Sequence, residues 1–361
     1  MVEATAAAAI ELVTLDLEPL PFVIDALASP RPGGANARLE GNAFVGGKLS
    51  TVKWSPDVFA AAPDGTLPMG DAGREWSYGN LDAGFRDTAL VLDRTFHTPC
   101  THHQPLETRS AMAYWQNGTL YLHGSTQSVA QTVESVARWV GVDRAKVVII
   151  SEYTGGGFGS KIPGAHSMAI PALLSRKARA PVMMRVSREE EHHIGRARPN
   201  LIARAKVGVR KDGRITAVDL FIVQDAGPYD DQYDLESAPG ICSLAYQPLA
   251  MRFRGLSVLT NTPPRTSQRS PGGMQQNAIM EPILANAARQ LGLDSVAMHR
   301  INAPEGRANF GPPGKDGARS HVTSAFVREA LDRGAELFKW ESARRGAAND
   351  RARPYAALAS P

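Results

Sequence analysis

The sequence has 361 residues, of which 43% are hydrophobic and 21% charged, an ordinary balance for a globular protein of two or three domains. The formal net charge is only +4, and no basic cluster is interleaved with aromatic residues, which argues against nucleic-acid binding. No apolar run approaches the length of a membrane span, and the first residues lack the basic start and apolar core of a secretory signal.

The first predicted element is a helix over the alanine-rich Glu3–Ile10. Glu11–Leu17 alternates and predicts a strand. Ser29–Gly47 is rich in proline, glycine and asparagine, and Ala61–Gly79 is a second region of this kind, so both predict linkers or surface loops. Alternation over Thr88–His97 then predicts another strand.

The middle of the chain predicts a hairpin and a mixture of further strands and helices. Asn117-Gly118, the strongest short hairpin signal, lies between two predicted strands, Arg109–Trp115 and Leu120–Gly124. The remaining elements expected here are a helix over Ser125–Val140 with Ser125 or Thr126 as its cap, a helix over His166–Ala178, and strands over Lys146–Ile150 and Pro181–Ser187.

Toward the carboxy terminus, Asp212-Gly213 predicts a second hairpin. Helices and strands are mixed rather than strictly alternating, which favours the α+β class over a doubly wound sheet. Periodicity is lost over Arg344–Pro361, which predicts a disordered tail. The elements expected in this part are strands over Leu201–Val209, Ile215–Asp225 and Phe253–Leu259, and helices over Met274–Leu291 and within Ser320–Trp340.

A glycine-rich loop, Ser151–Lys161, lies between a predicted strand and a predicted helix. Its four glycines in five positions would let the backbone approach a ligand closely, and a following helix could present N–H groups to an anion. Neither the P-loop nor the dinucleotide-binding fingerprint fits these residues. A purely structural turn remains the alternative from this loop alone.

Four segments together resemble one family. Gly155–Lys161 resembles the first cofactor loop of the molybdenum hydroxylases, the xanthine dehydrogenase and aldehyde oxidase family. His103–Glu107, Ser125–Ser128 and Gln268–Gln276 resemble other parts of its molybdopterin-binding large subunit, in the same order. The likeness runs from about Glu3 to Glu341 and looks closest to the bacterial three-subunit aldehyde oxidoreductases.

The resemblance implies the mixed sheets and helices of such a large subunit, incomplete at both ends. It divides the chain into a remnant of the amino-terminal hammerhead domain over 1–25 and linker and loops over 26–85. The first molybdopterin-binding domain would follow over 86–341, with a tail over 342–361.

The same resemblance assigns cofactor contacts. Gln127 matches a glutamine that hydrogen-bonds an oxygen ligand of the molybdenum, Gly156–Gly159, which includes Gly157 and Phe158, matches the segment that lies along the cofactor, and Arg269 matches an arginine in the second cofactor segment. Taken alone, these residues would be a capping residue, a packed phenylalanine in a glycine turn, and a loop cation. Ile162 occupies the position of a glutamate that binds the heterocycle in purine hydroxylases, which implies an apolar pocket wall and favours an aldehyde.

Other polar clusters are expected to be structural. Glu189–His193 could suggest a metal site, but consecutive residues rarely converge on one ion, so a solvated turn is expected. The acidic group of Asp230, Asp231, Asp234 and Glu236 is expected to be a solvated face. Glu107 is also expected to be structural.

The resemblance implies a molybdenum cofactor, either molybdopterin or its cytosine dinucleotide form, and partner subunits that carry 2Fe-2S clusters and FAD. The implied activity is hydroxylation of aldehydes to carboxylic acids, with a purine or heterocycle hydroxylase as a weaker alternative. The family's general base, a glutamate in a Gly-x-Gly-Glu type segment, has no counterpart in the sequence. The chain alone is therefore expected to be inactive, as an internal fragment, half of a split enzyme, or a non-catalytic remnant.

Two further inferences concern charge and compartment. The pI near 9.1 suits an anionic cofactor or an acidic partner surface. Cys100 and Cys242 are too few for a metal cluster or a disulfide framework, which predicts a reducing compartment. A cytoplasmic location is expected, with the periplasm as an alternative if a partner subunit carries an export signal.

Overall fold

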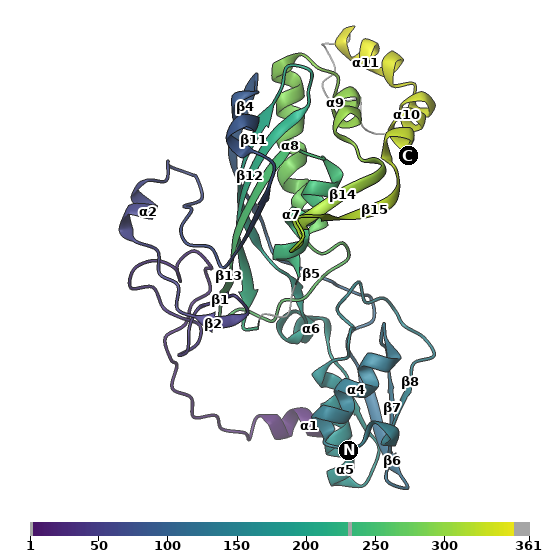
Figure 1. Cartoon of the computed structure of the whole chain (residues 1–361). Coiled ribbons are helices and arrows are strands. Elements are labelled where there is room, and N and C mark those ends of the chain that lie inside the picture. The colour runs from purple at the N-terminus through teal and green to yellow at the C-terminus, as the bar shows by residue number, and fades with distance from the viewer. Residues whose placement is uncertain (1–2, 230–232, 350–361) are drawn as a thin grey trace.

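The computed structural model describes residues 3–229 and 233–349. A large seven-stranded sheet and a smaller four-stranded sheet, each packed against helices, form the two main bodies (Figure 1). The sheets contain both parallel and antiparallel neighbours, which confirms the predicted α+β class.

The large sheet has the strand order β2-β1-β13-β12-β11-β4, and β3 also pairs with β13. The hairpin predicted about Asp212-Gly213 is confirmed, because β11 and β12 pair antiparallel on either side of it. The strands are β1 (Ala43–Val45), β2 (Lys48–Ser50), β3 (Arg74–Tyr78), β4 (Leu90–Thr98), β11 (Leu201–Val209), β12 (Ile215–Gly227) and β13 (Ala250–Leu259).

Strand β12 is buried on both faces, and successive side chains of a strand point to opposite sides of the sheet. On one side Ile222 belongs to a core formed with helix α8 (Gly273–Leu291). On the other side Phe221 belongs to a cluster with Trp54 and Leu67. Residues from the stretch expected to be linker and loops therefore cover one face of the sheet.

The smaller sheet has the order β8-β7-β6-β9, and its core is shared with two helices, α4 (Val129–Val140) and α5 (His166–Ala178). The hairpin predicted at Asn117-Gly118 is confirmed, with φ of +50° and +74° at the two turn residues. The strands are β6 (Ala111–Gln116), β7 (Thr119–Gly124), β8 (Val147–Ile150) and β9 (Val182–Met184).

The remaining elements connect or flank these bodies. The predicted helix over Glu3–Ile10 is confirmed as α1. The others are α2 (Pro56–Ala60), α3 (Leu81–Arg86), β5 (Thr101–His102), η1 (Arg144–Lys146), α6 (Arg188–Ile194), β10 (Ala197–Arg198), α7 (Asp234–Ala245), α9 (Ser295–Asn302), β14 (Glu305–Pro313), β15 (Arg319–Phe326), α10 (Val327–Phe338) and α11 (Trp340–Asn349).

The structure corrects several sequence predictions in the amino-terminal part and at the carboxy-terminal end. The expected strand over Glu11–Leu17 is absent, because no described strand pairs with this segment, whose apolar side chains are exposed. Ser29–Gly47 and Ala61–Gly79 are not loops throughout, since β1 and β3 form by pairing with β13. Helix α11 replaces the first part of the tail expected over Arg344–Pro361, and residues 350–361 lie outside the described part.

Within residues 3–229 and 233–349, no helix has the length and apolar character needed to cross a membrane.

A hydrogen-bonded carboxylate ties three helical segments together and makes stability depend on pH. Glu281 of α8 lies 2.7 Å from Nε2 of His299 in α9 and accepts a hydrogen bond of 2.6 Å from the hydroxyl of Tyr246 after α7. The hydrogen bond that the His299 ring makes to the Glu281 carboxylate raises the pKa of His299, against the opposing effect of burial. The stabilisation is thus present in full below the unfolded pKa near 6.5 and is lost as pH rises through the higher folded-state pKa.

We expect His299→Gln to lower the free energy of unfolding at about pH 6, because it removes the charged partner of Glu281. The loss should be only about 1 kcal/mol, since His299 and Glu281 are both partly exposed. The difference from wild type should shrink as pH rises toward about 9. Urea titrations across this pH range would measure it, and an equal difference at both ends would contradict the assignment.

Candidate functional site

The glycine-rich loop connects β8 to α5 in a conformation that ordinary residues rarely adopt. The backbone φ is +90° at Gly156, +56° at Phe158 and +109° at Gly159. A Cβ at Gly157 would lie 2.3 Å from the side-chain oxygen of Gln127, and one at Gly159 would lie 2.3 Å from the carbonyl oxygen of Ser267. Glycine is therefore required at Gly159 by both its φ and its approach to a backbone atom, whereas a Cβ at Gly157 would displace the Gln127 side chain from its place against the loop.

Gln127 is held against this loop by the carbonyl end of its amide. Its Oε1 accepts hydrogen bonds from the backbone N–H of Gly159 at 2.9 Å and of Lys161 at 3.2 Å. Two backbone donors fix which end of the amide faces the loop. The Nε2 group has no hydrogen-bond partner in the described part of the chain, so both of its N–H bonds are available as donors.

A second turn, residues 267–272, packs directly on the glycine-rich loop. The backbone N–H of Arg269 donates to the carbonyl of Phe158 at 2.9 Å. Ser270 and Gly272 have φ of +59° and +68°, so this turn is also built from left-handed backbone. The side chain of Arg269 is exposed. The two turns resembling cofactor segments are therefore in contact, although more than a hundred residues separate them in the sequence.

Arg198 holds the second turn in shape through hydrogen bonds to its backbone carbonyls. Arg198 is buried, and four of its five N–H donors bond to protein acceptors, which leaves it a structural role. The acceptors, at 2.7 to 3.2 Å, are the carbonyls of Arg269 and Ser270 and the side-chain oxygens of Gln268 and Gln275.

His103 joins the second turn to the segment that precedes β10. Its two ring nitrogens each lie 3.1 Å from a carbonyl oxygen, one of Arg196 and one of Ser267. The ring is buried, and burial lowers its pKa although the two backbone hydrogen bonds oppose this. His103 therefore positions backbone and is removed from solvent.

A cavity of about 650 Å³ opens between the two turns. The sequence-predicted residues that line it are Gln127, Phe158, Gly159, Ile162 and Arg269. Gly156 and Gly157 do not line it and lie in the loop behind. The other lining residues are Gln131, Pro163, Arg196, Tyr233, Thr266, Ser267, Gln268 and Pro271.

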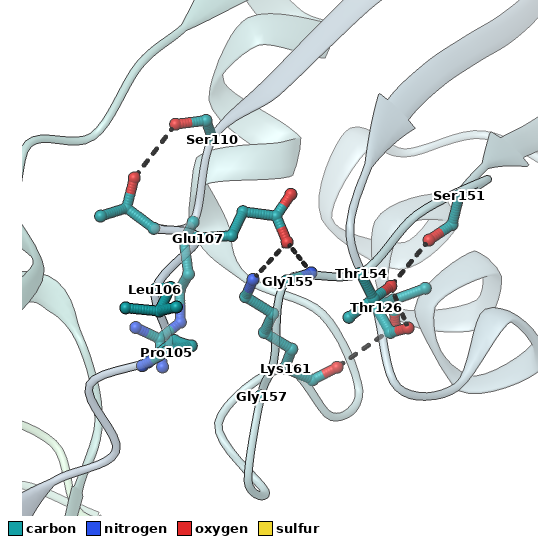
Figure 2. Close-up of polar contacts among 12 residues, drawn as sticks. Pro105, Leu106, Glu107, Ser110, Thr126, Ser151, Thr154, Gly155, Gly157 and Lys161 are labelled. Carbon is teal, nitrogen blue, oxygen red and sulfur yellow. Dashed lines mark hydrogen bonds and ion pairs between the residues drawn. The ribbon is translucent and has the colours of Figure 1, made fainter.

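The opposite side of the loop is held by Glu107, as Figure 2 shows. One carboxylate oxygen accepts from the Gly155 N–H at 2.7 Å and from the Lys161 ammonium at 2.9 Å. Burial raises the pKa of Glu107, but these hydrogen bonds outweigh it and leave the pKa below its ordinary value. The contacts give Glu107 the structural role expected from the sequence. A separate contact, from the Thr126 hydroxyl to the Lys161 carbonyl at 3.2 Å, braces the end of the loop.

A buried ion pair also anchors the loop, and it corrects a sequence prediction. Glu191 was expected in a solvated turn, but it lies in helix α6 and pairs with the Arg109 guanidinium, both side chains being 6% exposed. Arg109 donates a further hydrogen bond of 3.1 Å to the carbonyl of Ser160. Glu191 of α6 therefore supports the glycine-rich loop through Arg109.

Two further predictions about local structure were wrong. Asp234 was expected on a solvated face, but it is buried and accepts hydrogen bonds from the Gln275 amide at 2.8 Å and the Gly272 N–H at 3.0 Å. Burial raises its pKa. Asp230 and Asp231 lie outside the described residues. Helix α4 is capped by Ser128 rather than by Ser125 or Thr126, which are buried.

Sequence reasoning missed Arg196 and Arg198, which flank Ala197 in β10. Their importance depends on contacts with residues about 35 to 75 positions away, such as Ile162 and Gln275. No periodicity or motif in a single sequence reports such contacts. The only local signal was two arginines in a short segment before a proline.

Comparison with known proteins agrees with a cofactor-binding class of site. Residues 65–303 match the model of the molybdopterin cofactor-binding domain. This chain belongs to that family. Its relatives include molybdenum-binding subunits of the xanthine dehydrogenase and aldehyde oxidoreductase family.

Three relatives illustrate the range. The probable hypoxanthine oxidase XdhD of Escherichia coli is 29% identical over 273 residues, covering 73% of this chain and 28% of that protein. The nicotinate dehydrogenase large molybdopterin subunit of Eubacterium barkeri is 31% identical over 229 residues, covering 63% and 54%. The aldehyde oxidoreductase molybdenum-binding subunit PaoC of Escherichia coli is 27% identical over 264 residues, covering 73% and 35%. The chain thus spans 28% to 54% of the length of these relatives.

Solved structures share the fold. The aldehyde oxidoreductase from Desulfovibrio gigas has a TM-score of 0.74 at 22% identity, with 97% of this chain and 35% of that chain covered. The quinoline 2-oxidoreductase from Pseudomonas putida 86 has a TM-score of 0.77 at 21% identity, with 97% and 42% covered.

Proposed function

We propose that this chain supplies the first cofactor-binding part of a molybdenum oxidoreductase that hydroxylates aldehydes to carboxylic acids. The observation that carries the proposal is the direct contact between the glycine-rich loop and the Arg269 turn around one cavity. When bound, molybdopterin or its cytosine dinucleotide form would supply the oxygen transfer and accept the electrons.

The chain's own groups fit an oxyanion-bearing cofactor. The Gln127 amide has its oxygen committed to the loop, so its Nε2 would donate to an oxygen ligand without binding the metal. Glycine at 156, 157 and 159, with Phe158 in left-handed backbone, lets the main chain lie close along the cofactor. The exposed Arg269 side chain offers a fork of donors to an oxyanion.

Substrate choice would depend on Ile162, which lines the cavity. An isoleucine side chain cannot hydrogen-bond a heterocycle, so the proposed substrate is an aldehyde, as the name of the relative PaoC says for that protein. A heterocycle is the second candidate, and the names of the XdhD and nicotinate dehydrogenase relatives favour it.

Turnover would need a general base, and the sequence has no Gly-x-Gly-Glu type segment to supply the family's glutamate. We propose that the general-base glutamate lies on a complementary segment or chain, and that electrons leave through iron–sulfur and FAD subunits. General-base catalysis requires hydrogen-bond reach to the proton, so the isolated chain should not turn over. A non-catalytic remnant that only binds partners is the alternative.

The test is expression in a host that makes the cofactor, with and without a carboxy-terminal segment of a relative that carries the missing glutamate. Molybdenum per chain and benzaldehyde oxidation would both be measured. We expect little molybdenum and no oxidation for the chain alone, and both properties after assembly. Stoichiometric molybdenum with turnover in the isolated chain would refute the need for a second segment, and no molybdenum in either sample would refute the cofactor function.

A further inference from the structure

Arg196 occupies a place in the cavity that no cofactor contact assigned above uses. Its carbonyl oxygen lies 3.1 Å from Nδ1 of the His103 ring. Its Nη1 donates a hydrogen bond of 3.3 Å to the carbonyl of Ile162. These contacts fix the base and one corner of the side chain beside Ile162. Among residues 3–229 and 233–349, the Arg196 guanidinium pairs with no carboxylate. Its Nε and Nη2 groups have no hydrogen-bond acceptor in the same part of the chain.

Arg198, two residues along, provides the contrast. Arg198 is 3% exposed, and four of its five N–H donors bond to residues of the second turn and to Gln275. Arg196 is only half-buried and lines the cavity. Of these two arginines, Arg196 is the one that lines the cavity and still has both Nε and Nη2 to offer a ligand there.

The cavity has apolar walls and a positive charge at more than one point. Phe158, Ile162 and Pro271 contribute apolar surface, while Arg196 and Arg269 contribute two cations. No aspartate or glutamate occurs among the described residues that line it. An apolar pocket with a few fixed polar groups is typical of small-molecule sites, in which the polar groups set orientation.

We propose that Arg196 is a specificity-determining residue and that the cavity takes an organic substrate bearing a carboxylate on an apolar body. This inference rests on the proposed function, which places the substrate beside Ile162, the residue to whose carbonyl Arg196 donates. A guanidinium binds a carboxylate through two parallel charge-assisted hydrogen bonds. A neutral analogue would leave these donors unpaired in a partly desolvated site, so it would bind less tightly.

The test uses the purified full chain and measures binding by ligand-observed NMR titration. The probes are benzoate, 4-formylbenzoate, benzaldehyde and inorganic phosphate. We expect both carboxylates to bind at least about tenfold more tightly than benzaldehyde, because hydrogen bonds to charged groups are the stronger ones. Arg196→Gln should remove this advantage, and Arg196→Lys should keep part of it, since lysine retains the charge without the fork.

The matched control is Arg144→Gln, which removes an arginine whose side chain is 73% exposed and lies outside the cavity. It should bind every probe as wild type does, and circular dichroism should show that each variant is folded. Equal binding of benzoate and benzaldehyde by wild type, or unchanged benzoate binding by Arg196→Gln, would overturn the proposal. So would phosphate binding as tight as benzoate with the same loss in Arg196→Gln, because Arg196 would then serve a cofactor phosphate.

The result is separable from that of the proposed function. In the assembled protein, Arg196→Gln should keep its molybdenum content, since Arg196 is assigned to the substrate. Normal molybdenum with no carboxylate preference would sink this inference alone. Carboxylate preference in a protein that never takes up molybdenum would sink the proposed function and leave an organic-anion site.

Discussion

Replacing Glu191 by alanine is expected to lower the free energy of unfolding by about 3–5 kcal/mol, because it leaves the buried Arg109 guanidinium without its counter-ion. Both side chains are 6% exposed, so water cannot replace the lost carboxylate without rearrangement. The effect should reach the glycine-rich loop, since Arg109 also donates to the Ser160 carbonyl. Urea unfolding followed by circular dichroism would measure the change.

Glu189→Ala is the matched control, because Glu189 is an exposed glutamate of the same helix and charge. Its unfolding free energy should lie within about 0.5 kcal/mol of wild type. A loss no larger for Glu191→Ala than for Glu189→Ala would show that the pair does not hold this part of the fold.

The second large effect is expected from Gly159→Ala. The new Cβ would lie 2.3 Å from the carbonyl oxygen of Ser267, a backbone atom that cannot swing away, and φ is +109°. Backbone strain of this kind costs about 1–3 kcal/mol, and relief of the clash would push the two turns apart. In the assembled protein, cofactor affinity should fall about tenfold or more, which corresponds to a loss of about 1.4 kcal/mol or more.

Gly334→Ala provides the control, because Gly334 lies within exposed helix α10 and a Cβ there meets nothing within 4 Å. It should raise stability by roughly 0.5–1 kcal/mol and leave cofactor content unchanged. Molybdenum analysis and urea unfolding of both variants would check this. Wild-type molybdenum content in Gly159→Ala would mean that close contact between the turns is not needed for binding.

Turn residues and hydrophobic periodicity correctly predicted the elements that depend on neighbouring residues alone. The Asn117-Gly118 and Asp212-Gly213 hairpins were found from turn chemistry and alternation, and both occur as expected. The α5 helix over His166–Ala178 also has the predicted bounds. Three of the four segments with family resemblance, together with Ile162 just after the glycine-rich loop, supplied the candidate site residues, most of which line one cavity.

Elements that depend on distant partners were missed. Strands β1 and β3 have three and five residues in proline- and glycine-rich stretches and form because the edge of β13 is open to them. Glu191 appeared to be one charge in a solvated run, because its partner Arg109 lies 82 residues earlier. Arg196 and Arg198 gained roles only when the turns were brought together.

The most direct test of the shared site is hydrogen exchange of the assembled protein with and without its cofactor. Cofactor binding at the interface of the two turns should slow amide exchange in residues 155–160 and in 268–270 together, since both turns would lose the same opening motion. Protection of both segments in the loaded protein is the predicted result. Protection of only one turn, or of neither, would contradict a cofactor held between them.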